Sequence, residues 1–179
     1  MKQIRRNVFE TNSSSTHSIC ISKKPVTIGK HLYFGIGEYD WSHDCVDIVD
    51  YLYTAILEQD DSVELLEKLK SILDTYSISY EFKEPEYSYS DDGKWRCLEN
   101  GHIDHYDETR EFIEAVLADE DLLMRCLFGN SCVYTGNDND AEPYSMCYAA
   151  EPTVWDDNYK SVPNSNHDAA NYDYFFKGN

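Results

Sequence analysis

The sequence predicts an α+β fold, with an N-terminal β-hairpin and a small mixed body of short strands and three to four helices. Two observations support this prediction. Some segments alternate apolar and polar residues with a period of two, which is typical of strands, and others repeat apolar residues at helical spacing. A chain of 179 residues fits a single compact domain.

The first strands are expected in a hairpin over residues 3–23. The letters QIRRNVFE partly alternate, and the letters HSICISK alternate clearly, with Ile19 and Ile21 on one face. The polar letters between them, TNSSST, indicate a turn, because Asn and Ser side chains hydrogen-bond to their own backbone. We therefore expect an antiparallel hairpin with its tip between Glu10 and His17.

Helices are expected in two groups. Ser42 is placed to cap a helix over residues 43–58, and a second helix follows Ser62. We expect these two helices to pack as a helical hairpin. A further helical pattern begins at Glu108, and Asp119 either breaks it or caps a second short helix.

Short strands are expected among these helices, over residues 31–37, 77–84 and 131–136. Residues 85–107 are rich in Tyr, Asp and Gly, and the pattern is weak after residue 140. We expect irregular polar connections in both of these regions.

Charge divides the chain into two parts. Residues 1–30 carry 6 basic side chains and 1 acidic one, whereas residues 31–179 carry 9 basic and 33 acidic ones, within an overall net charge of −19. We call residues 1–30 the basic segment and residues 31–179 the acidic body. The basic segment is expected to attract nucleic acid, and the acidic body to repel it and to dock on a basic partner.

Several classes of protein are excluded. No apolar run is long enough to cross a membrane, and the N-terminus lacks the apolar stretch of a secretory signal. The 6 cysteines include no CxxC pair, which predicts buried free thiols in a cytosolic protein. Walker loops, dinucleotide-binding fingerprints and GxSxG elbows are absent, which argues against the commonest ATPases, dehydrogenases and hydrolases, and we expect no cofactor.

The letters RRNVFETNSSSTHS form the strongest candidate site. Arginine binds phosphate through bidentate hydrogen bonds, and His17 titrates near neutral pH, so it is suited to moving protons with Glu10 as its partner. Hydroxyl and amide groups here are suited to binding phosphate or stabilising a developing charge. The alternative is a serine-rich tip whose hydroxyls serve the turn. Beyond His17 and Glu10, the candidates are Asn12, Arg5, Arg6, Ser13, Ser14, Ser15, Thr16, Lys23 and Lys24.

Two other polar stretches are considered. In GHIDHYDE, the side chains of His102, Asp104, His105 and Asp107 are of types that bind metals, but the spacing matches no zinc site. The alternative is a loop in which Asp107 caps the next helix. The letters GNDND, residues 136–140, lack the Gly and Glu that complete a calcium loop, so we expect a turn and no metal.

The letters IRRNVFETNSSSTHSI, residues 4–19, resemble the N-terminal segment shared by small proteins of Firmicutes phages, plasmids and other mobile elements. Several of those proteins are anti-CRISPR proteins that inhibit the RNA-guided nuclease of type II-A systems. The length and acidity of the chain suit the members that target guide RNA. The resemblance implies a cytoplasmic protein of a bacterial host cell, whose partners are the nuclease and its guide RNA.

The resemblance further implies truncation of the guide RNA by the N-terminal hairpin. Cleavage of RNA needs a base for the 2′-hydroxyl, an acid for the leaving oxygen and cations for the phosphate. His17, Glu10 and Asn12 would then be catalytic, with the arginines, lysines and hydroxyls binding RNA, without a metal, and His102 or His105 could supply a second proton-transfer group. Enzymatic activity stays open, because the acidic body could instead mimic nucleic acid and block guide or target binding. A third possibility is a mobile-element protein with another partner.

Overall fold

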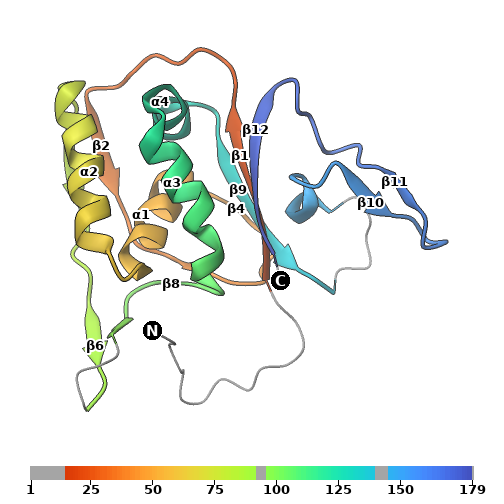
Figure 1. Ribbon diagram of the computed structural model, residues 1–179, viewed down its shortest axis with the longest axis horizontal. Helices are drawn as coiled ribbons and strands as arrows, with labels where there is room; N and C mark the ends of the chain where they lie inside the picture. The colour runs from red at the N-terminus through yellow and green to blue at the C-terminus, as the bar shows by residue number, and fades with distance from the viewer. Residues whose placement is uncertain (1–14, 92–95, 140–144, 179) are drawn as a thin grey trace.

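The computed structural model describes residues 15–91, 96–139 and 145–178, and it confirms the α+β class. Figure 1 shows three layers: helices on one side, a sheet in the middle and the C-terminal part of the chain on the other side. No helix within the described ranges is long and apolar enough to cross a membrane.

The middle layer is an antiparallel sheet built around the strand β1 (Ser15–Ser22). β12 (Tyr172–Lys177) pairs with one edge of β1, and β9 (Cys132–Asn137) pairs with the other edge. β4 (Cys45–Val46) extends the sheet beyond β9. All 8 residues of β1 are buried, because strands flank it on both sides and further layers cover both faces.

β1 pairs with β12 and β9, whereas the sequence predicted a hairpin between this strand and residues 3–10. Residues 3–10 lie outside the described residues, but both edges of β1 are already paired from His17 to Cys20. A strand has two hydrogen-bonding edges, and strands from distant parts of the chain occupy both edges of this part of β1. The expectation of an exposed tip reaching His17 is therefore wrong.

The described residues form four α-helices, which all lie on the same side of the sheet in Figure 1. They are α1 (Ile48–Glu58), α2 (Ser62–Thr75), α3 (Arg110–Ala118) and α4 (Glu120–Phe128), with α2 farthest from the sheet. α1 and α2 pack against each other, which confirms the expected helical hairpin, and α3 packs against α4. Asp119 caps α4, since its Oδ1 accepts from the backbone N–H groups of Asp121 and Leu122, 3.0 and 3.1 Å away.

The start of α1 differs from the sequence-based expectation. Ser42 does not cap it; instead, Oδ1 of Asp47 accepts from the backbone N–H groups of Val49 and Asp50, at 2.7 and 3.3 Å. The helix begins later because the chain before Asp47 is extended, where β4 joins the sheet. An apolar residue in that stretch, Val46, therefore follows a strand rather than a helical pattern.

Short strands and turns connect these elements, and β2, β5 and β9 lie close to the three predicted ranges. The additional strands are β2 (His31–Phe34), β3 (Glu38–Tyr39), β5 (Ser79–Phe82), β6 (Tyr87–Tyr89), β7 (Arg96–Leu98), β8 (His102–Ile103), β10 (Thr153–Trp155) and β11 (Ser161–Pro163). β2 pairs with β5 and β3 with β8 in parallel, whereas β6–β7 and β10–β11 are antiparallel ribbons. The expectation of irregular structure throughout 85–107 and after residue 140 is thus wrong at these strands and at β12.

Two short 3₁₀ helices complete the fold. They are η1 (Tyr106–Thr109) and η2 (Met146–Tyr148). The first contains Asp107, so the expectation that Asp107 caps the next helix is wrong, and Thr109 precedes α3 instead.

The hydrophobic core lies between the sheet and the helices. Ile19 and Ile21 of β1 belong to the same buried cluster as Leu52 of α1, Leu69 of α2 and Leu123 of α4. Full burial of one such side chain is worth about 1.5–3 kcal/mol. The alternation expected for β1 is therefore confirmed, with its isoleucines facing the helical layer.

The opposite face of β1 contacts the C-terminal layer through polar groups. Ser18 Oγ donates to the backbone carbonyl of Cys147 at 2.7 Å and accepts from the backbone N–H of Ala150 at 3.0 Å. One hydroxyl thus ties the central strand to η2 and the segment after it. This is a structural use of a serine that lies within the N-terminal motif.

Candidate functional site

The candidate residues of the N-terminal motif do not form one exposed surface. Ser15, Thr16 and His17 lie within β1, and Lys23 and Lys24 follow its other end. Because a strand rises about 3.3 Å per residue, Lys23 lies roughly 25 Å from Ser15. The remaining candidates, Arg5, Arg6, Glu10, Asn12, Ser13 and Ser14, lie outside the described residues.

His17 is a core residue whose two ring nitrogens are both engaged. Nε2 lies 3.1 Å from the backbone oxygen of Asp40, and Nδ1 lies 2.8 Å from the hydroxyl of Tyr51. The carbonyl oxygen only accepts, so Nε2 carries the proton and Nδ1 accepts from the tyrosine. The imidazole is therefore neutral and its orientation is fixed from both sides.

The electrostatics of His17 agree with this geometry. Burial, together with the nearby charge of Lys177, lowers the pKa of His17 to about 3. His17 is 0% exposed, so its ring does not reach the solvent. The predicted position of His17 at an exposed tip was wrong, and the alternative of a structural residue fits its contacts.

Lys177 forms a buried polar cluster with the start of β1. Its Nζ donates to the backbone oxygen of Ser15 at 2.6 Å and lies 2.5 Å from Ser15 Oγ. The backbone N–H of Ser15 donates to Oδ2 of Asp104 at 3.4 Å. The cluster joins the start of β1, the end of β12 and the loop after β8.

Burial lowers the pKa of Lys177 to about 8, while the carboxylates of Asp104 and Glu108 oppose that shift. Burial raises the pKa of Asp104, but the charges of His105 and Lys177 and the hydrogen bonds from Ser15 outweigh it, so that pKa is lowered overall. The amine is thus mostly protonated at neutral pH and faces an ionised carboxylate.

A serine hydroxyl beside a lysine amine is also the arrangement of some nucleophilic catalysts. Here Ser15 is 0% exposed and Lys177 is 1% exposed, so neither side chain is open to a substrate. We therefore interpret this pair as a structural contact. The sequence carried no signal for it, because 162 positions separate the two residues.

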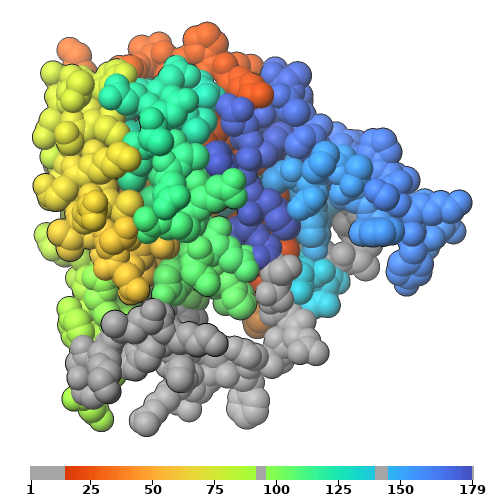
Figure 2. All heavy atoms as spheres, in the orientation of Figure 1, coloured from red at the N-terminus to blue at the C-terminus, as the bar shows by residue number. Residues whose placement is uncertain are grey.

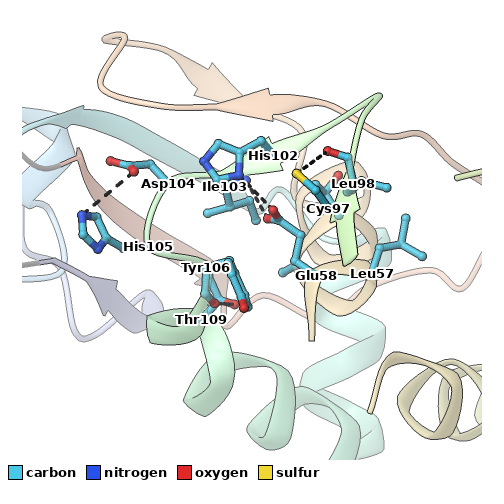
Figure 3. A network of polar contacts seen from close by, with 12 residues as sticks. Leu57, Glu58, Cys97, Leu98, His102, Ile103, Asp104, His105, Tyr106 and Thr109 are labelled. Carbon is cyan, nitrogen blue, oxygen red and sulfur yellow. Dashed lines mark hydrogen bonds and ion pairs between the residues drawn. The ribbon is translucent and has the colours of Figure 1, made fainter. Parts of the chain in front are cut away.

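A second polar site lies at the end of α1. Figure 3 shows His102 of β8 beside Glu58, whose Oε1 lies 2.9 Å from the imidazole Nδ1. Oε2 of Glu58 accepts from the backbone N–H of Ile103 at 2.7 Å. Both oxygens of this nearly buried carboxylate are therefore hydrogen-bonded. The backbone of β8 fixes the carboxylate through Ile103, and the carboxylate in turn orients the His102 ring.

The loop after β8 brings part of GHIDHYDE close to the start of β1. Asp104 contacts Ser15, and His105 Nε2 lies 4.0 Å from Oδ1 of Asp104, as Figure 3 shows. His105 is exposed and has a φ of 52°, which is uncommon for a residue with a side chain. The structure therefore brings this loop beside Ser15, at the start of β1.

A shallow pocket of about 240 Å³ opens beside His102. Glu38, Tyr39 and Asp40 form the rest of its lining. Carboxylates at such an opening repel phosphate groups, so this pocket does not favour RNA.

Neither a disulfide framework nor a metal centre forms in the described residues. All 6 cysteines are free, although only Cys20, Cys126 and Cys147 are buried and Cys45 is exposed. The described ranges contain no group of three His, Cys, Asp or Glu side chains placed to hold a metal ion. In GNDND, Asn137 Oδ1 accepts from the backbone N–H of Asn139 in a turn, and Asp140 lies outside the described residues.

Several basic side chains of the acidic body form ion pairs within the chain. Arg125 pairs with Asp121 and Asp173 at 2.9 and 2.8 Å, and Arg110 pairs with Asp61 at 2.6 Å. Many carboxylates face the solvent. They include Glu38, Asp40, Asp44, Asp47, Asp60, Glu64, Glu67, Asp74, Glu81, Glu84, Glu86, Asp107, Glu108, Glu111, Glu114, Asp119, Glu120, Asp121, Asp157 and Asp168.

This surface is the feature of the described residues that best matches a functional expectation from the sequence. It spreads over the loop before α1, the exposed faces of α2 and α3, and the start of α4. A distributed negative field of this kind attracts basic surfaces over distances comparable with the Debye length. Comparison of the chain with known protein families, curated proteins and solved structures finds no match.

Proposed function

We propose that the protein is a binding inhibitor of a type II-A RNA-guided nuclease. Its acidic body occupies a positively charged surface of the nuclease that otherwise holds guide or target nucleic acid. The observation that carries this proposal is the excess of 33 acidic over 9 basic side chains in residues 31–179, with carboxylates spread over the exposed helices and loops. The nuclease itself is suggested by the resemblance of residues 4–19.

The electrostatic argument favours binding to a protein over binding to RNA. Phosphate groups and exposed carboxylates repel each other, whereas a groove lined with Lys and Arg attracts the acidic body. Ion pairs such as Arg125–Asp173 hold basic side chains within the fold. These basic side chains therefore neutralise little of the negative charge on the outer surface.

Truncation of the guide RNA stays a prediction of the resemblance. The geometry of the described residues does not favour it, because His17 is neutral, buried and hydrogen-bonded at both nitrogens. The expected catalytic partners, Glu10 and Asn12, lie outside the described residues.

The test uses the purified protein, the nuclease and end-labelled guide RNA. We expect a complex of protein and nuclease, with the guide released at full length. A shortened guide would establish cleavage and contradict the binding mode, and an absence of any complex or effect would contradict the proposal as a whole.

The strength of the complex should also depend on salt. The Debye length falls from about 10 Å at 0.1 M salt to about 3 Å at 1 M, so the Kd is expected to rise at least tenfold over this range. Glu64→Gln with Glu111→Gln should weaken the complex further, and the matched control Ser71→Ala on α2 should leave the Kd unchanged. A Kd that is independent of salt would contradict an electrostatic interface.

A further inference from the structure

The ribbon β10–β11 presents two large aromatic side chains to solvent. Figures 1 and 2 show this ribbon projecting from the C-terminal layer, away from the helices. Trp155 is 66% exposed and Tyr159 is 86% exposed. Large aromatic side chains usually bury most of their surface, so two of them at one projecting turn are a candidate interaction surface.

The turn that carries these rings is held in a defined shape. Asp156 Oδ1 accepts from the backbone N–H groups of Asn158 and Lys160 at 2.8 and 2.9 Å. The backbone N–H of Tyr159 donates to the Asp156 carbonyl at 2.9 Å. Tyr159 has a φ of 55°, a left-handed conformation that is unfavourable for a bulky residue and that clusters at functional positions.

The ribbon is also fixed to the body. Val154 faces inward and is buried. Asn164, just after β11, is buried and its Nδ2 donates to the backbone oxygens of Tyr148 and Glu151 at 2.9 and 2.8 Å. The ring of His167 stacks on Tyr174 of β12, with 4.6 Å between their centroids. The two exposed rings therefore lie on a ribbon whose base contacts the rest of the C-terminal layer and the main sheet.

We propose that Trp155 and Tyr159 anchor the protein on an arginine-bearing surface of a protein partner. This inference rests on the proposed function, since it names the contact through which the protein docks. Rigid Trp and Tyr side chains at a protruding position lose little conformational entropy on binding, and such residues dominate many interfaces.

The charge around the ribbon selects arginine as the complementary group. Residues 151–168 contain the 4 acidic side chains Glu151, Asp156, Asp157 and Asp168 and the single basic side chain Lys160. A guanidinium group stacks on aromatic faces and pairs with carboxylates at the same time. Nucleic-acid bases also stack on aromatic rings, but their phosphates would meet these carboxylates.

The first measurement is the affinity of the full chain for the nuclease without its guide. Trp155→Thr keeps a residue that favours strands, and Tyr159→Asn keeps one that tolerates a positive φ. We expect each variant to weaken binding by about 30-fold, as for residues central to an interface. The control is Tyr89→Thr on β6, which is 65% exposed and lies at the other end of the molecule in Figure 1; it should change the Kd by less than about threefold.

The second measurement does not depend on the nuclease. NMR spectra of the full chain are recorded with a nona-arginine peptide, a nona-lysine peptide or a short single-stranded RNA. We expect the indole N–H signal of Trp155 to shift with nona-arginine, less with nona-lysine, and not with RNA. Equal shifts in the Tyr159→Asn variant, or a response to RNA instead of the peptide, would overturn the inference.

The two arms separate the two proposals. If the wild-type chain binds the nuclease and the ribbon variants bind equally well, the ribbon inference is wrong and the proposed function stands. If the wild-type chain does not bind the nuclease, the proposed function is wrong, and the peptide arm decides whether the ribbon recognises arginine. Far-UV circular dichroism and the Tm establish that each variant is folded.

Discussion

In both the strand β1 and the ribbon β10–β11, the burial of the side chains is the opposite of what their residue types suggest. β1 contains Ser, Thr and His and is buried along its whole length, whereas the ribbon exposes Trp155 and Tyr159. Polar groups are tolerated inside β1 because groups such as Ser18 Oγ and the His17 ring find partners on neighbouring elements. The difference indicates that the described part of the N-terminal motif, Ser15 to Ser18, serves the fold, and that the ribbon is the better candidate for contact with a partner.

Replacing His17 should have the largest effect on stability. His17→Ala leaves a cavity and removes partners from the Tyr51 hydroxyl and the Asp40 carbonyl, so we expect the free energy of unfolding to fall by about 4 kcal/mol. Urea denaturation followed by circular dichroism measures this change. Lys24→Ala, just beyond β1, is the control and should change stability by less than about 0.5 kcal/mol. A loss below about 1 kcal/mol for His17→Ala would contradict its structural role.

The Lys177 cluster should be the next most sensitive. Lys177→Met keeps most of the side-chain volume but leaves both oxygens of Ser15 without this donor and removes one of the positive charges near Asp104. We expect the free energy of unfolding to fall by about 3 kcal/mol. Lys177→Arg keeps the charge and should recover part of this loss. If the methionine variant is as stable as the wild type, the contact between β1 and β12 does not depend on this amine.

Mild acid should weaken the buried strand through His17. The pKa of His17 is about 3 in the folded protein and about 6.5 when the chain is unfolded. Below pH 6.5 the unfolded chain binds a proton that the folded chain does not, so stability falls as the pH falls, down to about pH 3. Between pH 7 and 5 this residue should remove about 2 kcal/mol from the free energy of unfolding.

The variant His17→Gln isolates this effect, because glutamine hydrogen-bonds but does not titrate in this range. The wild type should lose more stability than His17→Gln between pH 7 and 5, when both are measured by urea denaturation at each pH. Parallel pH profiles for the two proteins would show that His17 binds protons equally in the folded and unfolded states.

The smallest effect on stability is expected at the ribbon. Trp155→Thr removes a mostly exposed ring from a short strand, so the free energy of unfolding should change by less than about 0.5 kcal/mol. The Tm of the purified variant measures this. A loss above about 2 kcal/mol would show that Trp155 packs against the body, which would remove the contrast with β1.

Much of the helical layer could be predicted from the sequence, because local signals determine it. Asp119 caps α4 as predicted, and α2 begins at Ser62, where a helix was expected. α1 differed because Cys45 and Val46 follow the pairing of β4 with β9, which is a non-local contact. Periodicity reports local structure and does not distinguish such a contact from the first turn of a helix.

The candidate site was less predictable for the same reason. The alternation around Ile19 correctly predicted a strand, but both of its neighbours come from distant parts of the chain. The local sequence gives no sign of those neighbours, so the simplest prediction was a hairpin between this strand and the residues just before it. The burial of His17 and the contact of Lys177 with Ser15 both depend on β12, whose aromatic residues alternate poorly with polar ones.

The position of β1 in the sheet has a consequence for synthesis on the ribosome. The strand leaves the exit tunnel early, yet it needs β9 and β12, and Lys177 lies 162 positions after Ser15. At about 5–20 residues per second, β1 waits on the order of ten seconds or more for its final neighbour. β9 is synthesised before β12, so the edge of β1 that pairs with β12 stays without its native partner the longest. Contacts at such long sequence separation also form slowly.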